Sequence, residues 1–217
     1  MTHLKLTTIV LLTLVFSSTK AQNSSERLDT LVKEFVHQLA DKKIDTVCVY
    51  QKYCAGFITT WKNDEYKCNS GGMLVSTYIV WLDKGQTFMT KKDNCFDYST
   101  IKFNNETFWD FYFNNKDILA KEEIKMPQYN AIVKGKEQIY YSNIDHSCHQ
   151  EIKVYIKTLQ IDKDLDEYNF EKEIGSAKNK NINYDHNINL FLKKFQTKIE
   201  QTITNETKIN HLTKTRR

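Results

Sequence analysis

Residues 74–90 read LVSTYIVWLDKGQTFMT and predict a β-hairpin in the middle of the chain. The run 74–82 is rich in β-branched and aromatic side chains, which are typical of strands. A polar run follows at 83–86, and its Gly85 can take the left-handed backbone conformation that a short loop needs. A second β-forming run at 87–90 completes the hairpin. We therefore expect antiparallel strands at the centre of the fold.

The sequence on either side of this hairpin predicts further strands and helices. In one run, Ile152, Val154 and Ile156 alternate with lysine and tyrosine, which indicates a half-buried antiparallel strand. Strands that follow one another without intervening helices favour an α+β fold. We expect one antiparallel sheet of about six or seven strands, packed by two or three helices. The β-forming runs are 47–53, 55–61, 98–103, 129–133, 138–142 and 151–157, and apolar residues at helical spacing mark 25–40, 106–120 and 187–203.

The N-terminus has the three parts of a secretory signal peptide in the right order. A short polar start carries Lys5, an apolar stretch follows, and small residues run up to Ala21. The apolar stretch is shorter than the roughly 20 residues with which a helix crosses a bilayer. The sequence therefore predicts a signal peptide over 1–21 with cleavage near Ala21 and Gln22. We expect a secreted or periplasmic protein whose mature chain has no transmembrane segment.

Composition divides the mature chain into three parts. We expect an α+β domain over 22–160, a polar loop or linker over 161–186, and a C-terminal helix with a basic tail over 187–217. Residues 171–217 hold ten Lys and Arg against five Asp and Glu, so this region could attach to an anionic surface. A solvated helix face is the simpler explanation. No nucleic-acid partner is expected.

Five cysteines lie in the middle of the chain: Cys48, Cys54, Cys68, Cys95 and Cys148. In the oxidising compartment that an export signal implies, cysteines pair wherever the geometry allows. Five is an odd number, so at least one thiol is free, bound or intermolecular. The sequence does not select the pairing. A disulfide between Cys48 and Cys54 would require the chain to turn between them, because a straight strand holds them about 20 Å apart.

The densest group of chemically active side chains is Asp145-His146-Ser147-Cys148-His149. Imidazole and thiolate bind zinc or copper, so His146, Cys148 and His149 are candidate metal ligands. The same group could hold a nucleophile, with Cys148 as the attacking thiolate and His146 as its base. The third interpretation is a polar turn between strands in which Cys148 forms a disulfide. We favour this third interpretation and expect no cofactor, because the ligand spacing matches no standard metal motif.

Aromatic side chains offer a second kind of candidate site. Trp81 and Trp109 could line a ligand groove, although such residues more often belong to a hydrophobic core. The chain has no Gly-rich phosphate loop, no Gly-x-Ser-x-Gly elbow and no His-Glu-x-x-His motif. Catalytic activity is therefore uncertain, and a non-catalytic protein is favoured.

Two segments of the chain resemble small exported proteins of Bacteroidota-type bacteria. One runs from Tyr78-Ile79-Val80-Trp81 through Gly85 to Cys95, and the other is 145–149. The resemblance implies a location in the bacterial envelope or outside the cell, and it implies no catalytic residue. We therefore expect an exported domain that binds an unknown protein or small-molecule ligand. The alternative is an exported metalloprotein or cysteine-dependent enzyme centred on the turn at 146–149.

Overall fold

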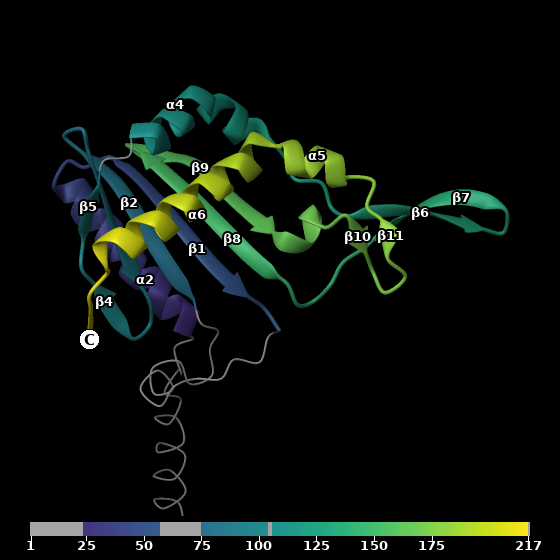
Figure 1. Cartoon of the computed structure of the whole chain (residues 1–217), viewed down its shortest axis with the longest axis horizontal. Coiled ribbons are helices and arrows are strands. Elements are labelled where there is room, and N and C mark those ends of the chain that lie inside the picture. Colours follow the sequence, from purple (N-terminus) through teal and green to yellow (C-terminus); the bar gives the residue numbers. More distant parts are fainter. Residues whose placement is uncertain (1–23, 57–74, 104–105, 217) are drawn as a thin grey trace, which may run out of the picture.

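The structure is a computed structural model that describes residues 24–56, 75–103 and 106–216. Its largest element is an antiparallel sheet with the strand order β12-β4-β3-β2-β1-β8-β9, in which β5 pairs with β3 (Figure 1). The predicted α+β fold with one large antiparallel sheet is confirmed. The strands of this sheet are β1 (Thr46–Cys54), β2 (Ser76–Asp83), β3 (Gln86–Lys92), β4 (Phe96–Tyr98), β5 (Ile101–Phe103), β8 (Cys148–Ile156), β9 (Thr158–Asp166) and β12 (Lys214–Arg216).

Some sequence predictions lie outside the described residues. These are the signal peptide over 1–21, its cleavage near Ala21 and Gln22, and most of the strand predicted over 55–61. Of that strand only Ala55 and Gly56 are described, and they form a turn after β1.

Helices cover both faces of the large sheet. Helix α2 (Ser24–Asp41) packs on one face, and α4 (Glu106–Lys121) and α6 (Phe191–Asn210) pack on the other (Figure 1). Successive side chains of a strand point to opposite faces, so β1 contributes to both layers. Val47 and Val49 pack in the cluster with α2, whereas Cys48 and Tyr50 pack in the cluster with α4 and α6. Burial on both faces explains why β1 is apolar without clear alternation.

The hairpin expected at 74–90 is formed by β2 and β3. Asp83 pairs with Gln86, and Lys84 and Gly85 form the loop with φ angles of 50° and 76°. Two consecutive positive φ angles are typical of a type I′ turn, whose twist matches that of the flanking strands. The expectation that Gly85 takes a left-handed conformation is confirmed.

The C-terminal helix begins four residues later than its predicted start at 187. A short helix, α5 (Tyr184–Asn189), precedes it, and α6 then starts at Phe191. The Glu122 carboxylate accepts hydrogen bonds from the backbone N–H of Phe191 (2.9 Å) and of Leu192 (2.7 Å). A carboxylate at this position satisfies free N–H groups and complements the helix dipole. The Glu122 side chain, which directly follows α4 in the sequence, therefore caps the first turn of α6.

The prediction of a polar loop or linker over 161–186 is wrong. This segment contains most of β9, a 3₁₀ helix, η1 (Glu167–Phe170), the short pair β10 (Glu173–Ile174) and β11 (Asn179–Lys180), and α5. Strand β9 pairs with β8 along the edge of the large sheet. Its apolar residues Ile161 and Leu165 are buried in the core, while Asp162 and Asp164 lie on the other face. Only one face of this edge strand is buried, so acidic residues occupy its other face. They lower the apolar content of the segment, and for this reason the sequence did not indicate a strand here.

The basic tail is also part of the sheet. Strand β12 pairs with β4, with Lys214 opposite Tyr98. The Lys214 ammonium lies 4.3 Å from the centre of the Phe96 ring, a cation–π contact. Among the described residues, no helix is long and apolar enough to cross a membrane.

Candidate functional site

The turn at 145–149 does not offer a free thiol. Cys148 forms a disulfide with Cys54, and the two residues are direct partners on the adjacent strands β8 and β1. A disulfide sulfur is neither a thiolate nucleophile nor a thiolate metal ligand. The structure therefore contradicts the assignment of Cys148, with His146, to catalysis, and it supports the interpretation of a polar turn with a bonded Cys148.

The two histidines of this turn lie in different surroundings. His146 is exposed and lies against Gly56, where a Cβ would come within 2.4 Å of the His146 Cβ. His149 stacks on Tyr53 with ring centroids 5.1 Å apart, and its Nδ1 lies 3.3 Å from Asp164 Oδ2. Within the described part of the chain, no group of three His, Cys, Asp or Glu side chains could hold a metal ion. The predicted ligand set of His146, Cys148 and His149 is not assembled here.

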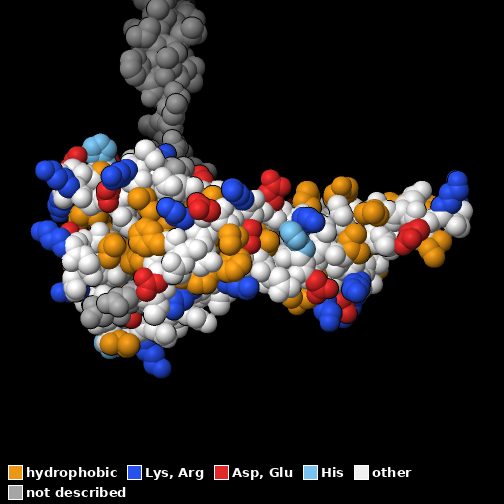
Figure 2. Space-filling view, turned by 90° about the horizontal axis from the view of Figure 1, so that it is seen from above, with side chains coloured by type: hydrophobic (Ala, Val, Ile, Leu, Met, Phe, Trp, Pro, Cys, Tyr) orange, Lys and Arg blue, Asp and Glu red, His pale blue; other side chains and the backbone are white. Residues whose placement is uncertain are grey.

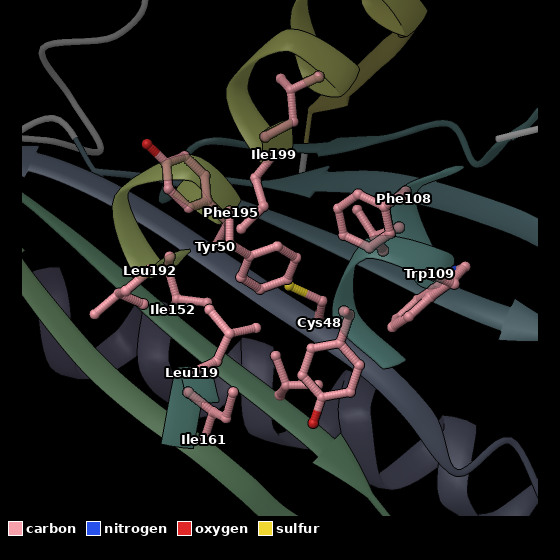
Figure 3. Close-up of a cluster of buried hydrophobic side chains, with 14 of the residues drawn as sticks. Cys48, Tyr50, Phe108, Trp109, Leu119, Ile152, Ile161, Leu192, Phe195 and Ile199 are labelled. Atoms are coloured by element: carbon pink, nitrogen blue, oxygen red, sulfur yellow. The ribbon is translucent and has the colours of Figure 1, made fainter. Parts of the chain in front are cut away.

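The two candidate groove residues are core residues. Trp81 is 6% exposed and lies between Phe35 and Phe88, at ring distances of 5.5 and 5.7 Å. Trp109 is 3% exposed and packs at right angles against Phe108, as Figure 3 shows. The prediction that Trp81 and Trp109 line a groove is wrong, because Trp81 of β2 is buried in the cluster with α2 and Trp109 of α4 is buried in the cluster on the other face of the sheet.

The free cysteine found among the described residues also lies in the core. Cys48 is unpaired and fully buried among the residues that Figure 3 shows, and Cys95 is disulfide-bonded. Burial raises the pKa of the Cys48 thiol to about 12. A protonated thiol without access to solvent is inert, so Cys48 is a structural residue.

A polar network links α6 to the sheet. Tyr50 donates its hydroxyl hydrogen to Glu200 Oε1 at 2.5 Å. The Lys52 ammonium lies 2.8 Å from Glu167 Oε1 and 3.6 Å from Glu200 Oε1. Gln150 Nε2 donates to Glu167 at 2.5 Å. The network joins α6 and η1 to β1 and β8, and we assign it a structural role because the carboxylates are already paired.

The feature that stands apart from the core is a hairpin, residues 128–141, which we call the arm. It consists of β6 (Gln128–Val133) and β7 (Lys136–Tyr141), which form a separate two-stranded sheet. Figure 1 and Figure 2 show that it projects from the body of the molecule, and six residues of strand extend about 20 Å. The loop residues Lys134 and Gly135 have φ angles of 52° and 73°, as in the β2–β3 hairpin.

The arm exposes large apolar side chains. Ile132 is 79% exposed, Ile139 is 60% exposed and Tyr141 is 68% exposed. All three belong to one face of the arm, because β6 and β7 pair with Ile132 opposite Glu137 and Asn130 opposite Ile139. On the other face Tyr129 and Tyr140 stack at 5.7 Å. Exposed apolar residues grouped in this way mark interaction surfaces.

Two buried asparagines anchor the first strand of the arm. Asn181 Oδ1 accepts a hydrogen bond from the Gln128 N–H at 3.3 Å. Asn187 accepts from the Lys125 N–H at 3.0 Å and donates to the Lys125 carbonyl at 2.8 Å. Both asparagines are at most 1% exposed. Buried amides with satisfied hydrogen bonds fix the path of the chain into β6.

A buried tyrosine anchors the chain that leaves the second strand. The Ser142 Oγ, directly after β7, lies 2.6 Å from the Tyr168 hydroxyl. The same hydroxyl accepts a hydrogen bond from the Gly175 N–H at 3.0 Å. Tyr168 is only 5% exposed. Because both strands are fixed at their base, the arm is presented to solvent in a defined direction.

One edge of the arm has backbone groups available for pairing. The Ser142 N–H donates to the Pro127 carbonyl at 2.9 Å, so Ser142 faces β6. The N–H and C=O of alternate residues point to opposite sides of a strand, so those of Glu137, Ile139 and Tyr141 point away from β6. All six residues of β7 are exposed, and within the described residues β7 pairs only with β6. This outer edge of β7 is the candidate binding site.

The sequence predicts both strands of the arm but does not predict that they form a sheet separate from the large one. The β-forming runs at 129–133 and 138–142 match β6 and β7 within two residues at each end, yet they were assigned to the main sheet. The available signal is the pair of runs joined by Lys134-Gly135, in which apolar residues occur on both faces. This local pattern does not show whether a helix covers the two faces of the hairpin.

Comparison with known proteins gives no relative. No protein-family model matches the chain, no curated protein matches it, and no solved structure matches it. The resemblance to small exported proteins of Bacteroidota-type bacteria therefore stays a prediction.

Proposed function

We propose that this protein is an exported binding domain that takes up an extended segment of a partner polypeptide on the β7 edge of the arm. The observation that carries the proposal is a projecting edge strand, exposed along its whole length and anchored by buried polar residues at its base. An exposed strand edge recruits another strand by forming backbone hydrogen bonds. An isolated two-stranded hairpin is only marginally stable in water, so a further strand would also stabilise the arm.

The side chains of the arm define the kind of segment it would bind. Backbone groups of Glu137, Ile139 and Tyr141 supply hydrogen bonds that any extended chain can satisfy. Ile139 and Tyr141 form an apolar strip on one face of β7. A partner with apolar residues at every second position would place them on this strip, because the side-chain period of a strand is two.

Two further observations support a location outside the cytoplasm. The N-terminal sequence has the order of a signal peptide, with an apolar stretch followed by small residues up to Ala21. The disulfide between Cys54 and Cys148 fits an oxidising compartment. We therefore place the binding activity in the cell envelope or outside the cell.

The proposal is tested with a random-peptide library displayed on phage and selected on the purified full chain. The matched counter-target is Ile139→Pro, which removes an N–H that points away from β6 and so spares the hairpin. We expect selected peptides with alternating apolar residues that bind the wild-type chain and lose binding to the variant. Peptides that bind both proteins equally, or an unsuccessful selection, would refute binding at the β7 edge.

A further inference from the structure

We infer that the partner segment is β7 of a second copy of this chain, so that two arms join edge to edge about a two-fold axis at Ile139. This inference rests on the proposed function and names its partner. In this arrangement the two hairpins form one four-stranded antiparallel sheet. The strand order would be β6-β7-β7-β6.

The backbone geometry of β7 is self-complementary. Its outward-facing residues are Glu137, Ile139 and Tyr141, and the middle one is the natural centre of a two-fold axis. Antiparallel pairing about this centre places Ile139 opposite its own copy and Glu137 opposite Tyr141 of the second copy. All three residues of each strand then exchange backbone hydrogen bonds. If the two-fold axis is moved by one residue, to Gln138 or Tyr140, only two of these three residues find a partner on the β7 strand of the second copy.

The charges of β7 are compatible with this register. The strand has one lysine and one glutamate, Lys136 and Glu137. The register centred on Ile139 places Lys136 opposite Ser142 and Glu137 opposite Tyr141, so no like charges face each other. A register centred on Glu137 would bring two carboxylates together, which is destabilising. The charges therefore exclude the register centred on Glu137 and are compatible with the centre that the hydrogen bonds favour.

The apolar side chains also meet in this register. Ile139 and Tyr141 share one face of β7 in each copy, and a two-fold axis perpendicular to the sheet keeps them on one face. The two Ile139 side chains become cross-strand neighbours at the centre of the new sheet. The arm projects from the body (Figure 1). Antiparallel pairing of the two arms therefore places the two bodies at opposite ends of the joined arms.

The size of the contact predicts a weak dimer. Two strands of six residues bury less surface than the roughly 1,200 Å² of a standard stable interface. We therefore expect a dissociation constant on the order of 10–100 µM, which is typical of a transient contact.

Sedimentation velocity of the purified full chain over a wide concentration range tests the inference. Ile139→Lys places two like charges at the centre of the contact and should raise the dissociation constant at least about tenfold. The matched control is Ile132→Lys, which puts the same charge on the same face but on β6. We expect the control to change the dissociation constant less than about threefold, because Ile132 is not on the paired edge.

Hydrogen exchange followed by NMR gives a second readout that does not depend on the variants. At high protein concentration the amide protons of Glu137, Ile139 and Tyr141 should exchange more slowly than in dilute solution. Those of Gln138 and Tyr140 should change little, because they already face β6. Slower exchange at all five positions to the same extent would refute pairing at this edge.

The outcomes separate this inference from the proposed function. A wild-type chain that stays monomeric while selected peptides bind β7 refutes the self-pairing and leaves the proposed function standing. A dimer that both lysine variants abolish equally refutes the β7 register, because general adhesion of the apolar face would then explain it. A monomer that also fails to bind any selected peptide refutes both.

Discussion

The disulfide between Cys54 and Cys148 should supply a large part of the folding stability. It joins the ends of the neighbouring strands β1 and β8, and the two cysteines are 94 residues apart in the sequence. The perturbation is the double variant Cys54→Ser, Cys148→Ser, which breaks the link without leaving a new thiol.

The expected magnitude follows from the length of the closed loop. In the chain-entropy account, a link across 94 residues lowers the entropy of the unfolded chain by an amount worth about 4.7 kcal/mol at 25 °C. Measured effects commonly fall below this value, so we expect the double variant to lose about 3–5 kcal/mol. A domain of this size is typically stable by about 5–15 kcal/mol, so the loss would be a substantial fraction of the total.

The assay is equilibrium unfolding in urea, followed by tryptophan fluorescence. Trp81 and Trp109 lie in the two different core clusters, so the signal reports on both layers of the fold. The dependence of the unfolding free energy on urea should steepen, because the unfolded variant is more extended and exposes more surface.

The control for this measurement is Cys48→Ala, which removes a buried cysteine that is not in a disulfide. It should cost about 1 kcal/mol, as the loss of a small buried side chain does. A loss below about 1 kcal/mol in the double variant, or a loss equal to that of Cys48→Ala, would refute the reasoning.

Three further predictions concern side chains of the body of the protein. Tyr50→Phe removes the hydrogen bond to Glu200 and should lower the free energy of unfolding by about 1–2 kcal/mol in urea titrations, and an unchanged stability would mean that the bond contributes nothing. Burial raises the pKa of Asp164, and Glu151 lies opposite on β8, so the ionised form is disfavoured in the folded state. Asp164 is half-exposed and also lies beside His149, so solvent screening and this contact keep the effect small. Asp164→Asn should therefore stabilise the protein by at most about 0.5 kcal/mol at pH 7. The gain should disappear as the pH falls below about 3.9, where the carboxyl is protonated in both states, and urea titrations with an equal gain at both pH values would contradict this. Native protein should not expose the Cys48 thiol to a thiol reagent, whereas in denaturant the wild-type chain should show one more reactive thiol than Cys48→Ala, and reaction of this thiol in the native state would show that the core is open.

The sequence by itself determined the local structure wherever one physical signal was strong. The run 74–90 combines β-forming residues with a Gly that accepts a positive φ, and β2 and β3 form there. Apolar residues at helical spacing identified α2, α4 and most of α6, because a helix that packs on a sheet must bury one face. The fold class followed from the order of these elements.

The tertiary structure decided how residues distant in sequence are paired and which surfaces are covered. The link between Cys54 and Cys148 depends on β1 and β8 being neighbours in the sheet, and cysteine spacing carries no such information. Likewise, the acidic strand β9 is stabilised by pairing with β8 and by burial of Ile161 and Leu165, which local propensity does not report.

For the candidate site, too, the sequence identifies the residue types and the tertiary structure decides which of them are available. The turn at 145–149 has residue types that metal binding or catalysis would need, but the pairing of β1 with β8 joins Cys148 to Cys54, so Cys148 offers no free thiol there. The arm has ordinary β-forming residues, and only the structure shows that no described helix covers it. Local sequence determines which backbone conformation is favourable, whereas exposure is a property of the whole packed molecule, and exposure makes the β7 edge available for binding.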